Sequence, residues 1–141
     1  MKAIMISINP QFVEKILSGE KTYEYRKSMF HDRSVEKLLI YETKPVCKVV
    51  AECHIDDVLV MPKHKLWEQT NQQSGISEDF FFKYFEKKEI AKAIKISNIQ
   101  KYENPKSLSD YGLKNAPRGY VYVDNVEENH RNCYVNPVIV V

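Results

Sequence analysis

The chain has 141 residues, which is the length of one typical domain. Its composition, with 43% hydrophobic and 28% charged residues, is that of an ordinary globular protein and excludes a disordered chain, a collagen, a repeat array and a disulfide scaffold. No apolar run approaches the ~20 residues that a transmembrane helix needs, and the N-terminal segment lacks the long apolar block of a secretory signal. We therefore expect a cytoplasmic protein with no membrane association.

The charged and metal-ligating residues indicate no metal site. The net charge is only +2, with a slight basic excess in residues 1–50 that fits either a polyanionic partner or a solvated surface. Cys47, Cys53 and Cys133 match no paired metal-ligand spacing, and His54 and His64 supply no HxxxH frame. We expect neither a metal nor a cofactor, and we expect Cys47 and Cys53 to be small core residues on one strand.

The chain begins with a predicted strand, helix and strand. Residues 2–8 contain three β-favouring isoleucines, and the Asn-Pro pair after them is typical of a helix start. Gly19 is expected to end that helix in the left-handed conformation. Residues 21–27 alternate in character, so Glu24 and Arg26 should project from the same side of the second strand.

Further strands and helices follow, and their order indicates the fold class. We predict strands at 35–43, 46–61, 90–102 and 120–123, helices at 63–73 and 77–88, and a short helical piece within 104–113. The helices are inserted between strands without regular alternation, which favours an α+β fold. Within that class we expect a small mixed β-barrel of about five to six strands with flanking helices. The domain is predicted to span residues 2–123. Residues 124–141 are then an extension, and its end (135–141) is either an added edge strand or a loose tail.

Three ionisable side chains of mixed sign are predicted to gather at Lys21, Glu24 and Arg26. Gly19 ends a helix just before them, so rigid elements on both sides would hold them within a few ångströms of one another. Arg26 and Lys21 could bind a phosphate or a base edge, with Glu24 accepting from an exocyclic amine or orienting Arg26. Alternatively, a desolvated Lys21 would have a lowered pKa and act as a general base or nucleophile. A third interpretation is an ordinary ion-pair cluster on a barrel wall.

The pattern Gly19-x-Lys21-x-x-Glu24-x-Arg26 resembles the GxKxxExR signature of the ASCH domain family, within the PUA-like superfamily. The resemblance extends over roughly residues 2–123. It implies a β-barrel with flanking helices and a cleft lined by the signature residues. It also implies an association with RNA, often in the regulation of transcription or translation. Some similar proteins are enzymes that cleave RNA or remove the acyl group of N4-acetylcytidine.

The chain departs from the amidohydrolase branch of that family at two positions. The resemblance implies that this branch uses the motif lysine, a threonine at the position of Glu24, and a glutamate in the later helical region. This chain keeps Lys21 but has Glu24 in place of the threonine, and residues 70–73 read TNQQ where the acid is expected. Because a carboxylate is a poor substitute for a hydroxyl nucleophile, the departure argues against amide cleavage.

Four more residues are candidates for the mouth of the cleft. Tyr41 and Lys44 lie at the end of a predicted strand beside a proline turn, and the alternative for them is a surface turn. Arg118 and Tyr120, separated by a glycine, offer a cation and a stacking ring that would suit a base with its phosphate nearby. For Tyr120 the alternative is packing within the sheet.

These observations leave three functions open. The first is a module that binds single-stranded RNA or a nucleotide in a cleft lined by Lys21, Glu24 and Arg26. The second is an RNA-directed hydrolase, in which Lys21 is the base and Glu24 the acid or orienting group. The third is a regulatory protein whose cleft binds a nucleotide-like metabolite and whose C-terminal strand mediates assembly. The oligomeric state is left open.

Overall fold

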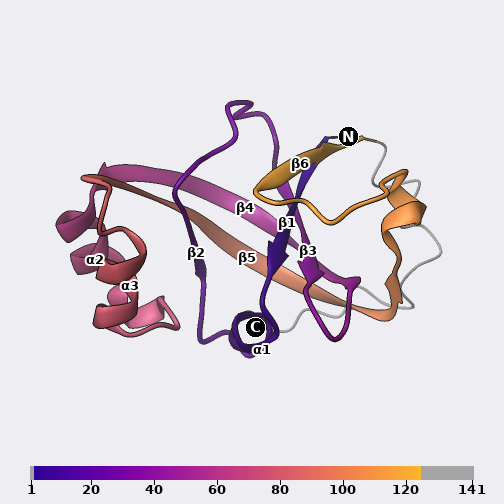
Figure 1. Ribbon diagram of the computed structural model, residues 1–141, viewed down its shortest axis with the longest axis horizontal. Coiled ribbons are helices and arrows are strands. Elements are labelled where there is room, and N and C mark those ends of the chain that lie inside the picture. Colours follow the sequence, from indigo (N-terminus) through magenta and orange to yellow (C-terminus); the bar gives the residue numbers. More distant parts are fainter. Residues whose placement is uncertain (1, 125–141) are drawn as a thin grey trace.

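The computed structural model describes residues 2–124 and builds them around one six-stranded sheet (Figure 1). The strands are β1 (Ala3–Ile8), β2 (Tyr23–Arg26), β3 (Lys37–Glu42), β4 (Lys48–Pro62), β5 (Ile90–Lys106) and β6 (Tyr120–Val123). The helices are α1 (Pro10–Leu17), α2 (Lys63–Thr70) and α3 (Glu78–Tyr84), with short 3₁₀ turns η1 (Asn71–Gln73) and η2 (Leu108–Tyr111). The expected α+β class with about six strands and flanking helices is therefore confirmed. The predicted tail strand at 135–141 lies outside the described residues.

The strands lie in the order β2-β5-β4-β3-β1-β6. β1 and β3 are parallel, whereas β1 with β6, β2 with β5, β3 with β4, and β4 with β5 are antiparallel. A parallel pair needs a crossover connection, and α1 with β2 supplies it between β1 and β3. The first strand is thereby placed inside the sheet, and the last described strand lies at its edge.

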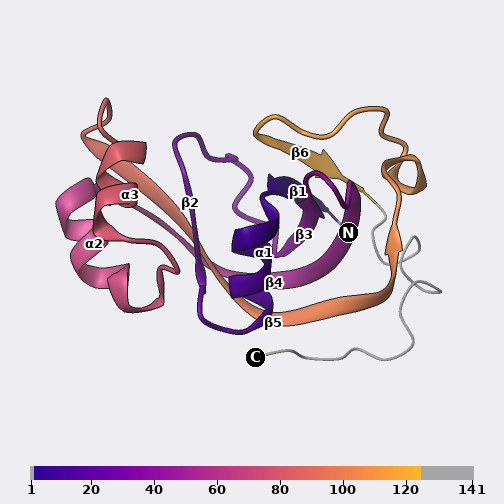
Figure 2. The same cartoon turned by 60° about the horizontal axis from the view of Figure 1, so that its bottom comes forward.

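The sheet curves strongly but is not closed into a hydrogen-bonded barrel. Its edge strands are β2 and β6, and no pairing joins them among residues 2–124. Each has only four residues, and α1 lies between β2 and β1 in both ribbon views (Figure 1, Figure 2). One side chain does cross this opening, because Arg26 on β2 donates from Nη2 to the carbonyl oxygen of Gly119, 3.0 Å away, just before β6. We call this opening between the two edge strands the seam.

β4 and β5 are the longest strands and carry α2 and α3 at one end. Their pairing contains register shifts at three places along β4, and such bulges bend a strand and increase its twist. α2, η1 and α3 form the connection between the two strands and lie together at the left of Figure 1. The predicted helix over 63–73 is thus an α-helix over Lys63–Thr70 followed by a 3₁₀ turn over Asn71–Gln73.

Three groups of buried side chains hold these elements together. The largest packs α1 against the sheet through residues such as Val13 and Ile16, the apolar stripe of that helix. A second, which includes Phe81 and Phe85, packs α2 and α3 onto β2 and β5. The third lies beneath η2. The expectation that Cys47 is a core residue is wrong, because Cys47 is exposed in the turn before β4 begins.

Candidate functional site

A cleft of about 280 Å³ opens at the seam, where β1, β2, α1 and α3 approach one another. It is lined by Ser7, Ile8, Asn9, Phe12, Lys21, Glu24, Tyr25, Arg26, Ile76, Phe80, Tyr84 and Arg118. The volume is at the lower end of the range for small-molecule sites. Because the sheet does not close here, side chains from distant parts of the chain can meet around one small ligand.

Lys21 is the most buried cation of the cleft, with 3% of its surface exposed. Its Nζ donates to the carbonyl oxygen of Ser74 at 2.8 Å and lies 4.9 Å from the ring centre of Tyr25. Burial lowers the pKa of Lys21 from 10.5 to about 8, although the nearby Glu24 carboxylate acts in the opposite direction. Lys15 lowers the pKa further by charge repulsion. The amine is therefore closer to neutrality at physiological pH than an ordinary lysine.

Gly75 makes the burial of Lys21 possible. Its φ of +67° lies in the left-handed region, and the Lys21 side chain lies directly against it. A Cβ at this position would be 2.7 Å from Lys21 Cβ, 3.0 Å from Cγ and 3.1 Å from Cδ. The missing side chain of Gly75 therefore leaves room for the lysine.

Glu24 and Arg26 form an ion pair on the same face of β2, as the alternation of that strand predicted. Arg26 Nη1 donates to Glu24 Oε2 at 3.2 Å, and its Nη2 donates to Gly119 as described above. The Glu24 side chain is 9% exposed and that of Arg26 is 18% exposed. Arg26 therefore has two functions, because it holds the carboxylate in place and also bridges the seam.

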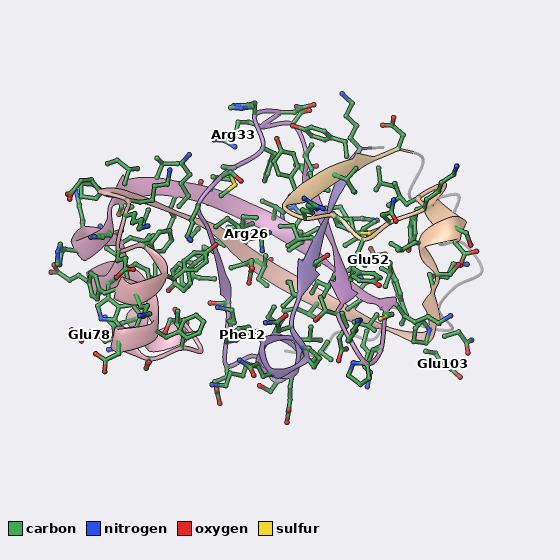
Figure 3. All side chains as sticks on the ribbon, viewed as in Figure 1. Phe12, Arg26, Arg33, Glu52, Glu78 and Glu103 are labelled. Carbon is green, nitrogen blue, oxygen red and sulfur yellow. The ribbon has the colours of Figure 1, made fainter. Side chains whose placement is uncertain are left out.

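The mouth of the cleft combines a free cation with aromatic rings. Arg118 is exposed, and no ion pair or hydrogen bond involves its side chain within residues 2–124. Phe12 on α1 and Phe80 on α3 meet edge to face, with ring centres 5.5 Å apart. Tyr84 completes this wall, and Lys27 lies over its ring at 4.7 Å. Phe12 and Arg26 mark the lower and upper parts of this region in Figure 3.

Tyr25 and Thr70 form the inner support of the site. Their hydroxyl groups share a hydrogen bond of 2.7 Å, and Thr70 also donates to the carbonyl oxygen of Leu66. Burial raises the pKa of Tyr25 to about 12, so its hydroxyl stays protonated at neutral pH. Thr70 lies in the segment where the amidohydrolase branch is expected to have its glutamate, and here it serves the packing of α2 against β2.

The other predicted site residues do not line the cleft. Tyr41 is 6% exposed and packs on the opposite face of β3, in the group of side chains beneath η2. Lys44 is exposed in the turn between β3 and β4. Tyr120 packs edge to face against Phe30 and Tyr122. The structure therefore brings together Lys21, Glu24, Arg26 and Arg118 from the predicted set.

Several residues of the cleft were not singled out from the sequence. Phe12 lies on α1, and Phe80 and Tyr84 lie on α3, where apolar side chains ordinarily pack in the core. Phe80 gave one usable signal, because three consecutive phenylalanines cannot all face one core, and it is 46% exposed. Within the described part of the chain, no group of three or more histidine, cysteine or acidic side chains is placed to hold a metal ion. No helix in that part is both long and apolar enough to span a membrane.

The family assignment follows from comparison with known proteins. The ASCH domain profile matches residues 6–100, which include the whole GxKxxExR segment and most of the cleft. The chain belongs to the ASCH domain family. An ASCH domain-containing ribonuclease of Zymomonas mobilis is 29% identical over 99 residues, which cover 70% of this chain and 67% of that protein.

Two relatives from Ureaplasma parvum serovar 3 are much longer than this chain. Large ribosomal subunit protein uL22 is 32% identical over 123 residues, which cover 86% of this chain but 39% of uL22. ATP synthase subunit alpha is 31% identical over 123 residues, covering 86% of this chain and 15% of that subunit. This chain thus spans well under half the length of either relative.

Solved structures of the Zymomonas mobilis ASCH protein have the same fold. The crystal structure of that protein superposes with a TM-score of 0.79 at 24% identity, covering 89% of this chain and 90% of the other. A point variant gives a TM-score of 0.82 at 23% identity, covering 93% and 96%. At this identity the likeness establishes the fold of the ASCH domain.

Proposed function

We propose that this ASCH domain binds single-stranded RNA and holds one of its nucleotides in the cleft at the seam. The observation that carries the proposal is the meeting of Lys21, Glu24 and Arg26 with aromatic rings in a cleft of nucleotide scale. Proteins that bind unpaired nucleotides combine aromatic stacking with cationic contacts to the backbone. Membership of the ASCH family and similarity to an ASCH ribonuclease support RNA as the ligand.

Each part of the cleft has a role in this proposal. The exposed Arg118 binds the phosphate, because it has no competing partner among the described residues. The edge-to-face pair of Phe12 and Phe80 receives the face of the base. Lys21 and Glu24 contact the base edge or the sugar from the inner end of the cleft. The seam admits an extruded or terminal nucleotide, since a cleft of about 280 Å³ is too small for a duplex.

The test is a binding measurement with purified protein and short labelled single-stranded RNAs. Wild type should bind with an affinity that falls as salt rises, with a slope of about −0.7 per phosphate contact. Arg118→Ala, an exposed change, should weaken binding and make the slope shallower, while Lys114→Ala on the same connection serves as the control. Equal binding by wild type and Arg118→Ala would show that Arg118 does not contact the RNA. No RNA binding by wild type would reject the proposed function.

RNA cleavage is a second candidate, and the burial of Lys21 favours it. With a pKa of about 8, about a tenth of the Lys21 amines are neutral at pH 7, which is the form needed for a general base. In this reaction Lys21 accepts the proton of a ribose 2′-hydroxyl. The 2′-oxygen then forms a bond to the adjacent phosphorus while the bond to the 5′-oxygen breaks. The departing 5′-oxygen takes a proton from water, giving a 2′,3′-cyclic phosphate and a free 5′-hydroxyl, and Lys21 returns its proton to the solvent. A nearby guanidinium such as Arg118 stabilises the charge on the phosphate oxygens.

Product analysis separates binding from cleavage. Single-stranded RNA is incubated with wild type and with Lys21→Met, and products are resolved by gel electrophoresis and mass spectrometry. Cleavage that is lost in Lys21→Met while RNA binding survives identifies an enzyme. Binding by both proteins without any product identifies a binding module. Cleavage at the same rate by both would show that Lys21 is not the base.

A further inference from the structure

The Glu24 carboxylate retains acceptor capacity that the protein does not use. Oε2 accepts a hydrogen bond from Arg26, and within residues 2–124 no other group donates to this carboxylate. A carboxylate has about four acceptor positions in its two oxygens. With only 7% of its surface exposed, Glu24 has little access to water. A ligand that brings N–H groups to this carboxylate therefore supplies hydrogen bonds that the protein itself does not make.

The Lys21 ammonium supplies donors in the same cleft. One of its N–H groups is used by the carbonyl oxygen of Ser74. An ammonium has three donors, so two remain for the space beside Tyr25 and the cleft. The inner end of the cleft thus presents an acceptor from Glu24 and donors from Lys21 to the same ligand.

This arrangement complements the edge of an amino-substituted base. We propose that the cleft prefers cytosine, adenine or guanine to uracil, an inference that rests on the proposed function. An exocyclic amino group donates to Glu24, and the ring nitrogen or carbonyl oxygen beside it accepts from Lys21. The base packs with one face on the aromatic wall of Phe12 and Phe80, which is indifferent to base identity. The discrimination therefore comes from Glu24.

Uracil fits this arrangement poorly. Its pairing edge carries a single N–H between two carbonyl oxygens, so a carboxylate that approaches the N–H also faces those oxygens. Arg26 fixes Glu24 on β2, so the carboxylate cannot turn away to relieve this repulsion. An amino-substituted base has a donor at the position of one of these oxygens. The Glu24 carboxylate thus attracts the edge of an amino-substituted base and repels the pairing edge of uracil.

The experiment compares cytidine and uridine, which have nearly the same shape and differ at this edge. Labelled RNA octamers of cytidine, adenosine or uridine are titrated with the full chain, and binding is followed by fluorescence anisotropy. Two variants carry the same chemical change, Glu24→Gln in the cleft and Glu103→Gln on the exposed surface of β5, well away from Phe12 and Arg26 in Figure 3. Thermal unfolding verifies that each variant is folded.

We expect wild type and Glu103→Gln to bind the cytidine and adenosine octamers about tenfold more tightly than the uridine octamer. Glu24→Gln should lose most of this preference, because its amide offers a donor to the uracil oxygens. Equal binding of cytidine and uridine by wild type would overturn the inference and leave the proposed RNA binding intact. A preference that persists in folded Glu24→Gln would also overturn it. If no octamer binds, both the inference and the proposed function fail.

Discussion

Gly75→Ala tests whether the buried position of Lys21 depends on the missing side chain at residue 75. The backbone of Gly75 has a φ of +67°, and a left-handed conformation costs a non-glycine residue about 1–2 kcal/mol. The added Cβ would also lie 2.7 Å from Lys21 Cβ, and forcing extra atoms into packed space costs about 1–3 kcal/mol. We expect a total loss of about 2–5 kcal/mol in the free energy of unfolding, measured by urea titration.

Gly112→Ala is the matched control for this substitution. Gly112 also has a positive φ, +75°, but a Cβ there would meet no heavy atom within 4 Å. The Gly112→Ala variant should lose only the cost of the left-handed backbone, about 1–2 kcal/mol in the free energy of unfolding. The difference between the two variants therefore measures the contact with Lys21. Equal losses would refute the reasoning that Gly75 accommodates this lysine. RNA binding should also fall in Gly75→Ala and remain unchanged in Gly112→Ala.

Three substitutions test other contacts of the site. Lys21→Met should abolish a pH effect on stability that wild type shows. The pKa of Lys21 is about 8 in the folded protein against 10.5 in the unfolded chain, so the unfolded chain binds more protons between these values. The free energy of unfolding of wild type should therefore rise by about 2.5 kcal/mol relative to the variant between pH 7 and pH 10, measured by urea titrations at the two pH values. Tyr25→Phe should cost about 1 kcal/mol in urea unfolding, because Thr70 loses one buried partner but keeps another; no loss would show that the hydroxyl pair does not stabilise the fold. Arg26→Lys should weaken RNA binding about tenfold in fluorescence anisotropy, since an ammonium cannot contact both Glu24 and Gly119; wild-type affinity would contradict the bridging role.

Most of the fold and the centre of the site were predictable from local sequence. The alternation of residues 21–27 placed Glu24 and Arg26 on one face because a strand has a period of two. Likewise, a helix-ending glycine followed by a strand predicted that Lys21, Glu24 and Arg26 would gather, and all three line one cleft. These predictions needed only the geometry of adjacent residues.

Long-range contacts set the features that the sequence did not reveal. β3 is buried on both faces, so its pattern could not tell that Tyr41 faces away from the cleft. The open seam depends on how the short strands β2 and β6 are placed by their neighbours in the sheet. The role of Gly75 depends on Lys21, which is distant in the chain, and a Ser-Gly pair after a helix is typical of many turns.

The pairing of β1 with β6 brings the two ends of the described fold together. Ala3 is the partner of Val123 in this antiparallel pair, so the backbone enters and leaves the described fold at adjacent positions on two neighbouring strands. A polypeptide with neighbouring entry and exit points can be inserted into a host loop, or circularly permuted, with little distortion of either partner. The fold of this chain is therefore suited to insertion into a longer polypeptide.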